Sequence, residues 1–545
     1  MRRWNGWGDE NTSLALPEAG KEFLESRIGL GVRLDDATLE AVVSKVPESR
    51  LPAHPGVDRS PETRVRHARG QSLPDWLAMR SGAFEVFPDG VAFPESSEEV
   101  AELLNWCDTH DVVVIPYGGG TSVAGHINPL ASERPVLTLS LARMNQLMEL
   151  DEVSHIATFG AGTPGPMVEA QLRARGYTLG HFPQSWELST IGGWVASRSS
   201  GQQSLRYGRI EQLFIGGRVE TLKGTLELPP IPASSAGPDV RELILGSEGR
   251  LGVITEVKVK VTPLPEHEDF YVVFFPDWER ARNASRALVQ ARVPLSMLRL
   301  SNAVETETQL ALAGHPSQIA LLEKYLSVRG AGHGKCMMTF GVTGTRLQCR
   351  QALSQTRRTL KPFEPVHTGK LLGRKWKAKR FLMPYLRESL WEAGYAVDTL
   401  ETCTPWSNVD RLLNLIEQNL RTVLEDEGGR VHVFTHLSHF YPQGCSIYTT
   451  YVFPNAGSYE ETLARWVRLK TTTSELIVKH GGTISHQHGV GKDHAPYLKT
   501  EKGPVAISML EQVTRHMDAH QRLNPGTLLI DSTETARTSG HAEME

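Results

Sequence analysis

A short apolar strand that runs directly into three consecutive glycines is the feature that most constrains how this chain folds. Residues 112–116 read Val-Val-Val-Ile-Pro, and residues 117–123 read Tyr-Gly-Gly-Gly-Thr-Ser-Val. Consecutive glycines permit positive φ and let backbone N–H groups approach a ligand closely, as a pyrophosphate-binding loop requires. The stretch is neither Gly-x-Gly-x-x-Gly nor a Walker loop, since no Lys-Ser/Thr pair follows. Taken alone, it could equally be a plain tight turn.

Two later segments have the composition of ligand-lining loops. Residues 182–201 are crowded with Ser, Gly and Thr, and residues 246–255 enter an apolar strand through another glycine turn. Long structured loops with many small hydrogen-bonding residues usually line a ligand. They favour a ligand-binding role for the glycine corner over a plain turn.

Short strands alternate with helices around these corners, which indicates an α+β fold. Residues 96–111 read as an amphipathic helix with a Ser cap and acidic residues in its first turn, where the helix dipole favours them. Further strands are predicted at 135–141, 155–162, 251–265 and 269–275, and further helices at 166–176, 277–291, 408–428 and 461–482. No internal repeat or long low-complexity segment is evident.

The bulk composition excludes several classes of protein. A net charge of −4 argues against a nucleic-acid binder that works by broad phosphate neutralisation. The N-terminus Met-Arg-Arg-Trp-Asn-Gly-Trp-Gly-Asp-Glu has no apolar stretch behind its basic residues, so a signal peptide is not expected. Five scattered cysteines without a Cys-x-x-Cys pair favour free thiols in a reducing cytoplasm: Cys107, Cys336, Cys349, Cys403 and Cys445.

In this order, the three loops resemble the FAD-binding domain of the vanillyl-alcohol oxidase and p-cresol methylhydroxylase family. The resemblance implies FAD held by a two-subdomain α+β domain, with an α+β cap domain beside it. The implied parts are an N-terminal region (1–87), the FAD-binding domain (88–265), the cap or substrate domain (266–480), a C-terminal segment (481–530) and a disordered tail (531–545).

The resemblance also implies which residues contact FAD. They fall into the three loops: Pro116, Tyr117, Gly118, Gly119, Gly120, Thr121 and Ser122; Pro183, Gln184, Ser185, Ser189, Thr190, Gly192, Gly193, Ala196, Ser197, Arg198 and Ser199; and Glu248, Gly249, Leu251, Gly252, Val253 and Ile254. Many members attach the flavin covalently through a histidine in or near the glycine loop. Thr121 and Ser122 stand there in this chain, so non-covalent FAD is expected.

Motifs along nearly the whole chain are similar to the alkyldihydroxyacetonephosphate synthase family. They include Trp-Asn-Gly-Trp-Gly at 4–8, Tyr-Leu-Arg-Glu-Ser-Leu at 385–390, Glu-Thr-Cys-Thr-Pro-Trp-Ser at 401–407, Ser-Ile-Tyr at 446–448 and Ser-His-Gln-His-Gly-Val-Gly-Lys at 485–492. The resemblance implies a homodimer that exchanges the acyl chain of 1-acyl-dihydroxyacetone phosphate for a fatty alcohol. Its partners are then a phosphorylated lipid and a fatty alcohol, with no nucleic acid.

The resemblance assigns roles to a few residues. Tyr448, His486 and His488 match the family's catalytic positions, since a phenol or an imidazole can transfer protons. Arg387 matches the arginine that binds the substrate phosphate. The remaining substrate-binding candidates are Arg299, His436 and His439.

Other interpretations of the same residues remain open. Tyr448 lies in an alternating strand, where a tyrosine is ordinarily a packed aromatic, and Arg387 could be a solvated cation or a partner of Glu388. His486 and His488 point the same way only if their segment is extended. A metal site involving histidines is a minor alternative, and no metal is expected.

Two departures from the family pattern keep a second function in view. Gln487 replaces the middle histidine of the family's triple run, and Ala233 stands where eukaryotic members have an arginine. His436 and His439 could compensate in part. The alternative is an FAD-dependent 2-hydroxy-acid dehydrogenase or oxidase of the D-lactate or glycolate type, which shares the flavin domain and a related His-Gly-x-Gly.

Residues 370–380 carry six basic residues interleaved with Leu and Trp. Such a stretch could rest on anionic lipid headgroups, which would add a peripheral membrane contact, or it could be a solvated basic helix face. The chain shows no run of apolar residues as long as a membrane span. A bacterial cytoplasmic enzyme, with or without membrane-surface association, is therefore expected.

Overall fold

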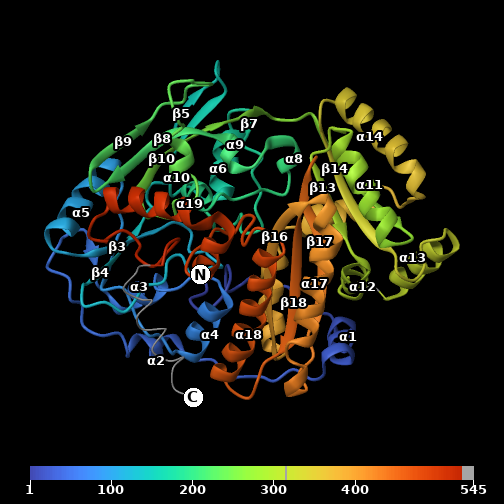
Figure 1. Cartoon of the computed structure of the whole chain (residues 1–545), viewed down its shortest axis with the longest axis horizontal. Helices are drawn as coiled ribbons and strands as arrows, with labels where there is room; N and C mark the ends of the chain where they lie inside the picture. The colour runs from blue at the N-terminus through green and yellow to red at the C-terminus, as the bar shows by residue number, and fades with distance from the viewer. Residues whose placement is uncertain (314–315, 531–545) are drawn as a thin grey trace.

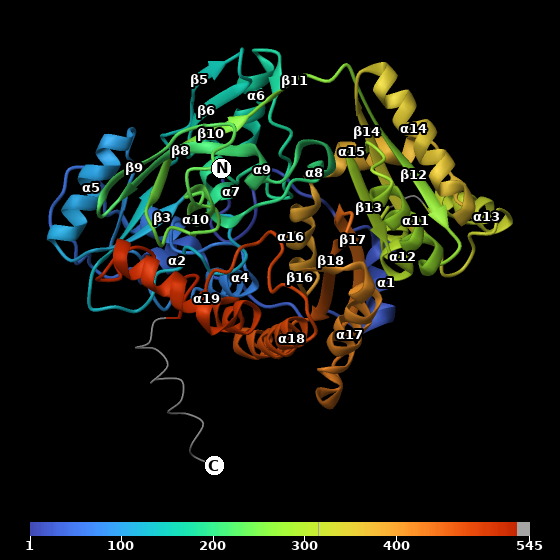
Figure 2. The ribbon, with the colours of Figure 1, turned by 45° about the horizontal axis from the view of Figure 1, so that its top comes forward.

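The structure is a computed structural model that describes residues 1–313 and 316–530, so the tail expected at 531–545 lies outside the described residues. Figures 1 and 2 both place the green and blue strands of the FAD-binding domain beside the yellow and orange strands of the cap. Helices cover the outer faces of both groups of strands. The predicted α+β fold, with a two-sheet FAD-binding domain and a separate cap sheet, is confirmed.

The first subdomain is a four-stranded sheet in the order β1-β2-β4-β3. Its strands are β1 (Val57–Asp58), β2 (Gly90–Ala92), β3 (Val113–Tyr117) and β4 (Val136–Ser140). Helix α5 (Ser97–Thr109) leads toward β3, and the Ser96 hydroxyl caps it by accepting a hydrogen bond from the backbone N–H of Glu99. Because β3 and β4 are parallel, their carboxyl ends meet at one edge, where the glycine corner begins.

The second subdomain is a five-stranded antiparallel sheet in the order β5-β6-β10-β8-β9. Its strands are β5 (Leu147–Asp151), β6 (Ile156–Gly160), β8 (Phe214–Thr221), β9 (Gly224–Leu228) and β10 (Val253–Lys260). The strand predicted at 251–265 ends at Lys260, because Pro263 has no N–H to donate within a central ladder. The chain continues as β11 (Thr262–Pro263), which pairs with β7 (Tyr177–Thr178).

Five short helices connect these strands and carry the predicted flavin loops. They are α6 (Gly165–Arg173), α7 (Ile191–Ser197), α8 (Ser204–Tyr207), α9 (Ile210–Leu213) and α10 (Arg241–Ile244). α7 begins inside the Ser- and Gly-rich segment, so that segment is a loop followed by a capped helix.

The cap is built on a seven-stranded antiparallel sheet in the order β15-β12-β14-β13-β17-β18-β16. Its strands are β12 (His267–Phe275), β13 (Met297–Ser301), β14 (Cys336–Gly344), β15 (Val366–His367), β16 (Tyr395–Pro405), β17 (His432–Tyr441) and β18 (Gly444–Pro454). Its helices are α11 (Trp278–Gln290), α12 (Ala303–Ala311), α13 (Pro316–Val328), α14 (Arg346–Leu360), α15 (Leu371–Lys379), α16 (Leu386–Glu392), α17 (Val409–Thr422) and α18 (Tyr459–Lys479). The predicted His436 lies on β17, and the predicted Tyr448 lies on the neighbouring β18.

The N-terminal region joins the two domains. It contains α1 (Glu18–Ile28), α2 (Leu39–Val43), α3 (Pro61–Arg66) and α4 (Leu73–Ser81). Trp7 and Trp76 are buried in the hydrophobic core of the cap, whereas β1 pairs with β2 of the FAD-binding domain. The Glu388 carboxylate accepts a hydrogen bond from the Trp7 backbone N–H at 3.1 Å and also pairs with Arg80.

The C-terminal segment returns to the FAD-binding domain through α19 (Ala495–Met517), a long helix that the sequence interpretation missed. Figure 2 shows α19 crossing beneath the strands of the FAD-binding domain toward α18. After the helix, the Val114 N–H donates to Arg522 O at 2.8 Å, and the Asn524 N–H donates to Val114 O at 2.9 Å. The end of the described chain therefore lies against β3.

The basic segment at 370–380 contains α15, and its cations divide into two groups. Lys370 pairs with Asp269, Lys377 pairs with Glu268, and the buried Arg380 guanidinium lies 4.7 Å from the centre of the Phe381 ring. Arg374, Lys375 and Lys379 are exposed. Among the described helices, none is both long and apolar enough to cross a membrane.

Candidate active site

The glycine corner after β3 packs against the Ser- and Gly-rich segment with no room for side chains. A Cβ at Gly119 would lie 1.9 Å from the carbonyl oxygen of Leu188, and one at Gly118 would lie 2.4 Å from Thr190 Oγ1. Gly120 adopts a positive φ of 66°. These positions therefore require glycine, and the backbone of the corner is left open to a ligand.

Polar groups around this corner fit a large polar cofactor. The Ser140 hydroxyl lies at the carboxyl end of β4, level with Tyr117, and it is buried with no hydrogen-bond partner among the described residues. Thr190 caps α7 by accepting from the Gly193 N–H at 3.3 Å. A glycine cradle with an unsatisfied buried hydroxyl is what a bound FAD would complete.

The remaining flavin-loop candidates have identified places. Arg198 ends α7 in a left-handed conformation and pairs with Glu242 at 3.1 Å. The Gln184 amide donates to Arg380 O at 2.7 Å, so this side chain faces the cap. Val253 and Ile254 open β10.

The contact between Glu248 and the segment from Gly481 to Lys492 accounts for the glycines that follow the two histidines. The Glu248 carboxylate accepts hydrogen bonds from the backbone N–H groups of Val490 at 2.5 Å and Gly491 at 2.8 Å. A Cβ at Gly491 would lie 1.9 Å from Ala124 O, and one at Gly489 would lie 2.5 Å from His126 Nε2. The glycines thus allow close contact with the FAD-binding domain.

Lys492 completes this contact. Its ammonium donates to the carbonyl oxygens of Gly125 at 3.3 Å and Asn128 at 2.7 Å, just beyond the glycine corner. Burial lowers the pKa of Lys492 to about 8. These hydrogen bonds therefore hold the segment that contains His486 and His488 against the predicted flavin loop.

Tyr448 lies at the centre of a group of titratable side chains in the cap. In the sheet it is paired with Glu401 of β16 on one side and His436 of β17 on the other. Its ring stacks on His436 at 4.7 Å between centroids and meets His488 edge-on at 6.0 Å. Burial raises the pKa of Tyr448, and its hydroxyl donates to Thr399 Oγ1 at 3.3 Å. The structure thus brings the predicted Tyr448, His436 and His488 together.

Each histidine beside Tyr448 faces a buried carboxylate. Glu401 Oε2 lies 3.7 Å from His488 Nε2, and Glu305 Oε2 lies 3.1 Å from His436 Nδ1. Burial by itself would raise the pKa of both carboxylates. The neighbouring histidines around Glu401, and His436 with Arg299 around Glu305, instead lower the pKa of each carboxylate to about 2. Arg299 forms an ion pair with Glu305 and so contributes to this group of side chains through that carboxylate.

His439 occupies a bulge in β17, where its φ of 47° is unusual for a residue other than glycine. Such bulges re-aim a side chain and occur often near active sites. Its Nδ1 lies 2.9 Å from the Ser200 hydroxyl and 3.2 Å from that of Ser204, and its ring lies 5.1 Å from the His486 ring. His439 thus links the cap to the loop that follows α7.

The Glu401, His439 and His486 side chains lie close enough for their ligand atoms to be within 4.8 Å of one another. However, the Arg209 guanidinium lies 2.7 Å from His486 Nε2. A fixed positive charge at this distance opposes cation binding to the same imidazole.

Arg387 is the second residue of α16, and its half-buried side chain lies between the N-terminal region and the cap. Its Nη1 donates to Gln71 O at 2.6 Å, and its guanidinium lies 4.1 Å from the centre of the Trp76 ring. Its Nε and Nη2 have no hydrogen-bond partner among the described residues. Burial lowers the pKa of Arg387 to about 10, so it stays charged at neutral pH. Of the alternatives in the sequence, a fully solvated cation is excluded, because Nε and Nη2 of this side chain are buried.

The sequence interpretation missed Glu401, Glu305, Arg209 and Lys470. Glu401 lies inside the quoted motif at 401–407, and the alternation of β16 could have placed it on the face of Tyr448. Lys470 of α18 is buried and donates to Thr399 O at 3.2 Å. Its place follows only from the packing of α18 on β16.

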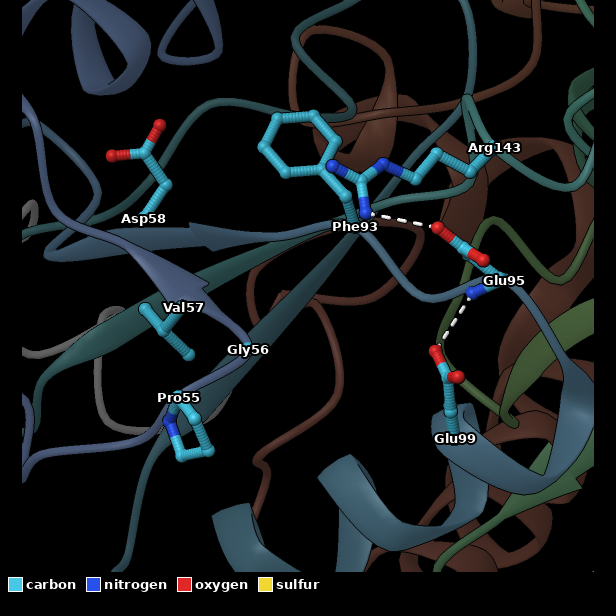
Figure 3. Close-up of a pocket in the computed structure, with 8 residues that line it drawn as sticks. All are labelled: Pro55, Gly56, Val57, Asp58, Phe93, Glu95, Glu99 and Arg143. Atoms are coloured by element: carbon cyan, nitrogen blue, oxygen red, sulfur yellow. Dashed lines mark hydrogen bonds and ion pairs between the residues drawn. The ribbon is translucent and has the colours of Figure 1, made fainter.

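Two cavities lie outside this group of residues or at its margin. One of ≈ 560 Å³ is lined by Arg209 and His486 and by the apolar side chains Leu498, Met509 and Leu510, among others. The other, of ≈ 470 Å³, is lined by residues of the FAD-binding domain and its N-terminal approach, and Arg143 pairs there with Glu95 (Figure 3). This second cavity contains none of the predicted site residues.

Comparisons with known proteins agree with this geometry. A family model described as "FAD binding domain" matches residues 88–228, and one described as "FAD linked oxidases, C-terminal domain" matches residues 264–528. The chain is 32% identical over 475 residues to alkyldihydroxyacetonephosphate synthase of Dictyostelium discoideum, a match that covers 86% of this chain and 77% of that protein.

Solved structures show the same relationship. A structure titled alkyldihydroxyacetonephosphate synthase matches with a TM-score of 0.83 and 27% identity, covering 96% of this chain and 98% of that one. The structure of p-cresol methylhydroxylase with substrate bound shares the fold, with a TM-score of 0.68 at 14% identity over 96% of this chain and 99% of that one. The predicted fold type and the FAD cofactor are confirmed, and the chain belongs to the alkyldihydroxyacetonephosphate synthase family.

Proposed function

We propose that this enzyme exchanges the acyl chain of a 1-acyl-dihydroxyacetone phosphate for a fatty alcohol and so forms the ether bond of an ether-lipid precursor. The relatives that carry this activity in their names cover most of the chain. The exchange involves no net oxidation or reduction. It requires a group that binds phosphate and groups that move protons.

The Arg387 guanidinium, two of whose nitrogens are buried, is the observation that carries the proposal. Two of its nitrogens have no partner among the described residues, although burial of an unsatisfied charged donor is costly. A phosphate oxygen pair would satisfy both nitrogens through charge-assisted hydrogen bonds. Lys470 offers a second buried cation in the cap.

Proton transfer falls to Tyr448 and the histidines beside it. The reaction removes a proton from C1 of the substrate and delivers one to the departing carboxylate. A neutral imidazole at His488 can accept the first proton, and the Tyr448 hydroxyl can donate the second. The raised pKa of Tyr448 keeps this hydroxyl protonated at neutral pH.

When bound, FAD would supply the electrophilic ring that this chemistry requires. The residues that would hold it are those of the glycine corner, the loop that leads into α7 and the turn that contains Glu248 and Gly249. Attachment is non-covalent in this proposal, because Thr121 and Ser122 replace the histidine of covalently flavinylated relatives.

Compartment and assembly are further parts of the proposal. The five cysteines are free and four are buried, which suits a reducing cytoplasm. Exposed Leu371 and Met383 flank exposed Arg374 and Lys375, a combination that suits contact with an anionic lipid surface. The family resemblance suggests a homodimer.

A 2-hydroxy-acid dehydrogenase is the second candidate, because the two nitrogens of Arg387 that have no partner among the described residues could bind a carboxylate as well as a phosphate. Incubation with palmitoyl-dihydroxyacetone phosphate and labelled hexadecanol separates the two. The proposal expects a labelled ether product and no bleaching of the flavin by D-lactate or glycolate. Bleaching by a hydroxy acid without any ether product would establish the dehydrogenase instead.

A further inference from the structure

Two hydrogen-bond donors converge on one nitrogen of His486. Arg209 Nη1 and the Tyr441 hydroxyl each lie 2.7 Å from His486 Nε2. A guanidinium can only donate, so Nε2 must be the accepting nitrogen. The ring proton of the neutral imidazole is therefore on Nδ1.

The opposite nitrogen faces a carboxylate. His486 Nδ1 lies 3.2 Å from Glu401 Oε1, and the two side chains are 3% and 0% exposed. The Nδ1–H group donates to this oxygen. Both nitrogens of His486 thus have fixed roles, and a second proton would have to enter beside the guanidinium, which makes imidazolium formation costly.

Arg209 is itself held in place from several directions. Its Nη2 donates to the carbonyl oxygens of Arg198 at 3.1 Å and His486 at 2.9 Å, and its Nε lies 2.9 Å from Glu211 Oε1. These contacts come from the FAD-binding domain as well as from the histidine segment. The donor to Nε2 is consequently rigid.

The hydrogen bond from His486 also orients Glu401 toward the second histidine. Glu401 Oε2 has no hydrogen-bond partner among the described residues and lies 3.7 Å from His488 Nε2. His488 is 22% exposed, and its ring meets Tyr448. Of the two histidines, only His488 has both a neighbouring anion and an accessible ring.

We propose that His486 is a positioning residue, held as the Nδ1–H tautomer by Arg209. His486 orients Glu401, so that of the two histidines His488 is the one that transfers a proton. The inference rests on the proposed function for the identity of the reaction, but the tautomer of His486 does not depend on that identity. The proposal gives His486 and His488 different roles, although the two histidines look equivalent in the sequence.

Glutamine substitutions test the assignment. The His486→Gln side chain has one oxygen to accept from Arg209 and one amide to donate to Glu401, but no titratable proton. We expect it to lose no more than about tenfold in kcat, the effect of one weakened hydrogen bond. His488→Gln should lose about 10²–10⁴-fold, as expected for removal of a proton-transfer group.

His486→Leu, which cannot make either hydrogen bond, should lose more activity than His486→Gln, so the conservative variant acts as the rescue. FAD content and thermal unfolding of every variant report whether it folds. Equal losses in His486→Gln and His488→Gln would overturn the assignment.

Long-range ¹H–¹⁵N spectra of the ¹⁵N-histidine-labelled holoenzyme give a readout that does not require turnover. The His486 signals are identified by their absence from the spectrum of His486→Gln. They should show the Nδ1–H tautomer without change between about pH 5.5 and 8, the range in which an isolated histidine would titrate. An Nε2–H or imidazolium pattern would refute the inference. If the wild type forms no ether product but shows this tautomer, only the proposed function fails.

Discussion

At the scale of single residues, the site depends on two buried carboxylates on either side of Tyr448. Glu401 faces His486 and His488, and Glu305 faces His436. A buried anion favours the protonated form of the imidazole beside it. The Glu401 carboxylate therefore opposes the effect of burial on the pKa of His488, and a substitution at Glu401 tests this directly.

Glu401→Gln should move the acid limb of the pH–rate profile to lower pH. Burial lowers the pKa of His488, and the Glu401 carboxylate opposes that shift. Without the carboxylate the lowering is unopposed, so His488 becomes neutral, and able to accept a proton, at a lower pH than in the wild type. Profiles of kcat/KM against pH for the two enzymes measure the displacement. The other charged or titratable groups that face His488 are Asp398, Lys470, His486, His494 and Tyr448.

Glu305→Gln is the matched control, because this carboxylate is equally buried but contacts His436. Its acid limb should stay at the wild-type position even if the rate falls. Equal displacement in both variants would mean that Glu401 has no particular influence on His488.

Arg387→Ala should raise KM for the phosphorylated substrate strongly and leave FAD content unchanged. Charge-assisted hydrogen bonds are each worth about 1.5–3 kcal/mol, and every 1.4 kcal/mol is about tenfold. Arg387→Lys keeps the charge without the planar fork and should give an intermediate KM. Steady-state kinetics with the acyl substrate measure all three enzymes, and a KM equal to that of the wild type in Arg387→Ala would reject the phosphate role.

The sequence proposed Tyr448, Arg387 and the two histidines as site residues because each matches a position in a motif of the family. Glu401 and Arg209 were not predicted, because their roles depend on contacts between segments far apart in the chain. Arg209 meets His486 across 277 positions of sequence. No local period or spacing records such a contact.

At the scale of elements, caps and alternation predicted most strands and helices, and irregular backbone caused the errors. α19 was missed because Gly503, with a φ of 78°, and Pro504 interrupt its pattern. The bulge at His439 was equally invisible, since a single residue in a left-handed conformation leaves the alternation around it intact.

Gly491→Ala should weaken FAD retention as well as folding. The new Cβ would meet Ala124 O at 1.9 Å and would sit on a backbone with a φ of 56°, so the histidine segment must move away from the glycine corner. Gly503→Ala is a matched control, since Gly503 also has a positive φ but a methyl group there would have no other atom within 4 Å. A backbone conformation that L residues rarely adopt costs about 1–3 kcal/mol in either variant. Thermal unfolding should show both losses, and FAD titration should show weaker binding for Gly491→Ala alone.

At the scale of the whole molecule, the site is assembled from parts that are distant in sequence. The N-terminal region supplies Gln71 and Trp76 around Arg387, the cap supplies Tyr448 and its carboxylates, and the C-terminal segment supplies the histidines. Lys492 and Glu248 attach that last segment to the glycine corner. The flavin loops are thus held by contacts from both ends of the chain. Loss of FAD should therefore destabilise segments well beyond the loops themselves.

FAD should therefore be removable by acid, and its removal should destabilise the whole protein. The glycine corner contains no histidine or cysteine, and the nearest histidine, His126, is held with its Nδ1 2.6 Å from the Ser122 hydroxyl and its Nε2 3.2 Å from Glu248. Acid precipitation of the yellow protein should leave all the flavin in the supernatant, whereas colour that stays with the pellet would show a covalent bond.

A ligand that binds only the folded state stabilises it by about 2.7 kcal/mol at a hundredfold excess over Kd. The apoprotein should consequently unfold at a lower temperature and recover when FAD is added, and hydrogen exchange should show the loss in the histidine segment 481–492 as well as in the flavin loops. Protection that is lost in the flavin loops alone would mean that the C-terminal segment is held independently of the cofactor.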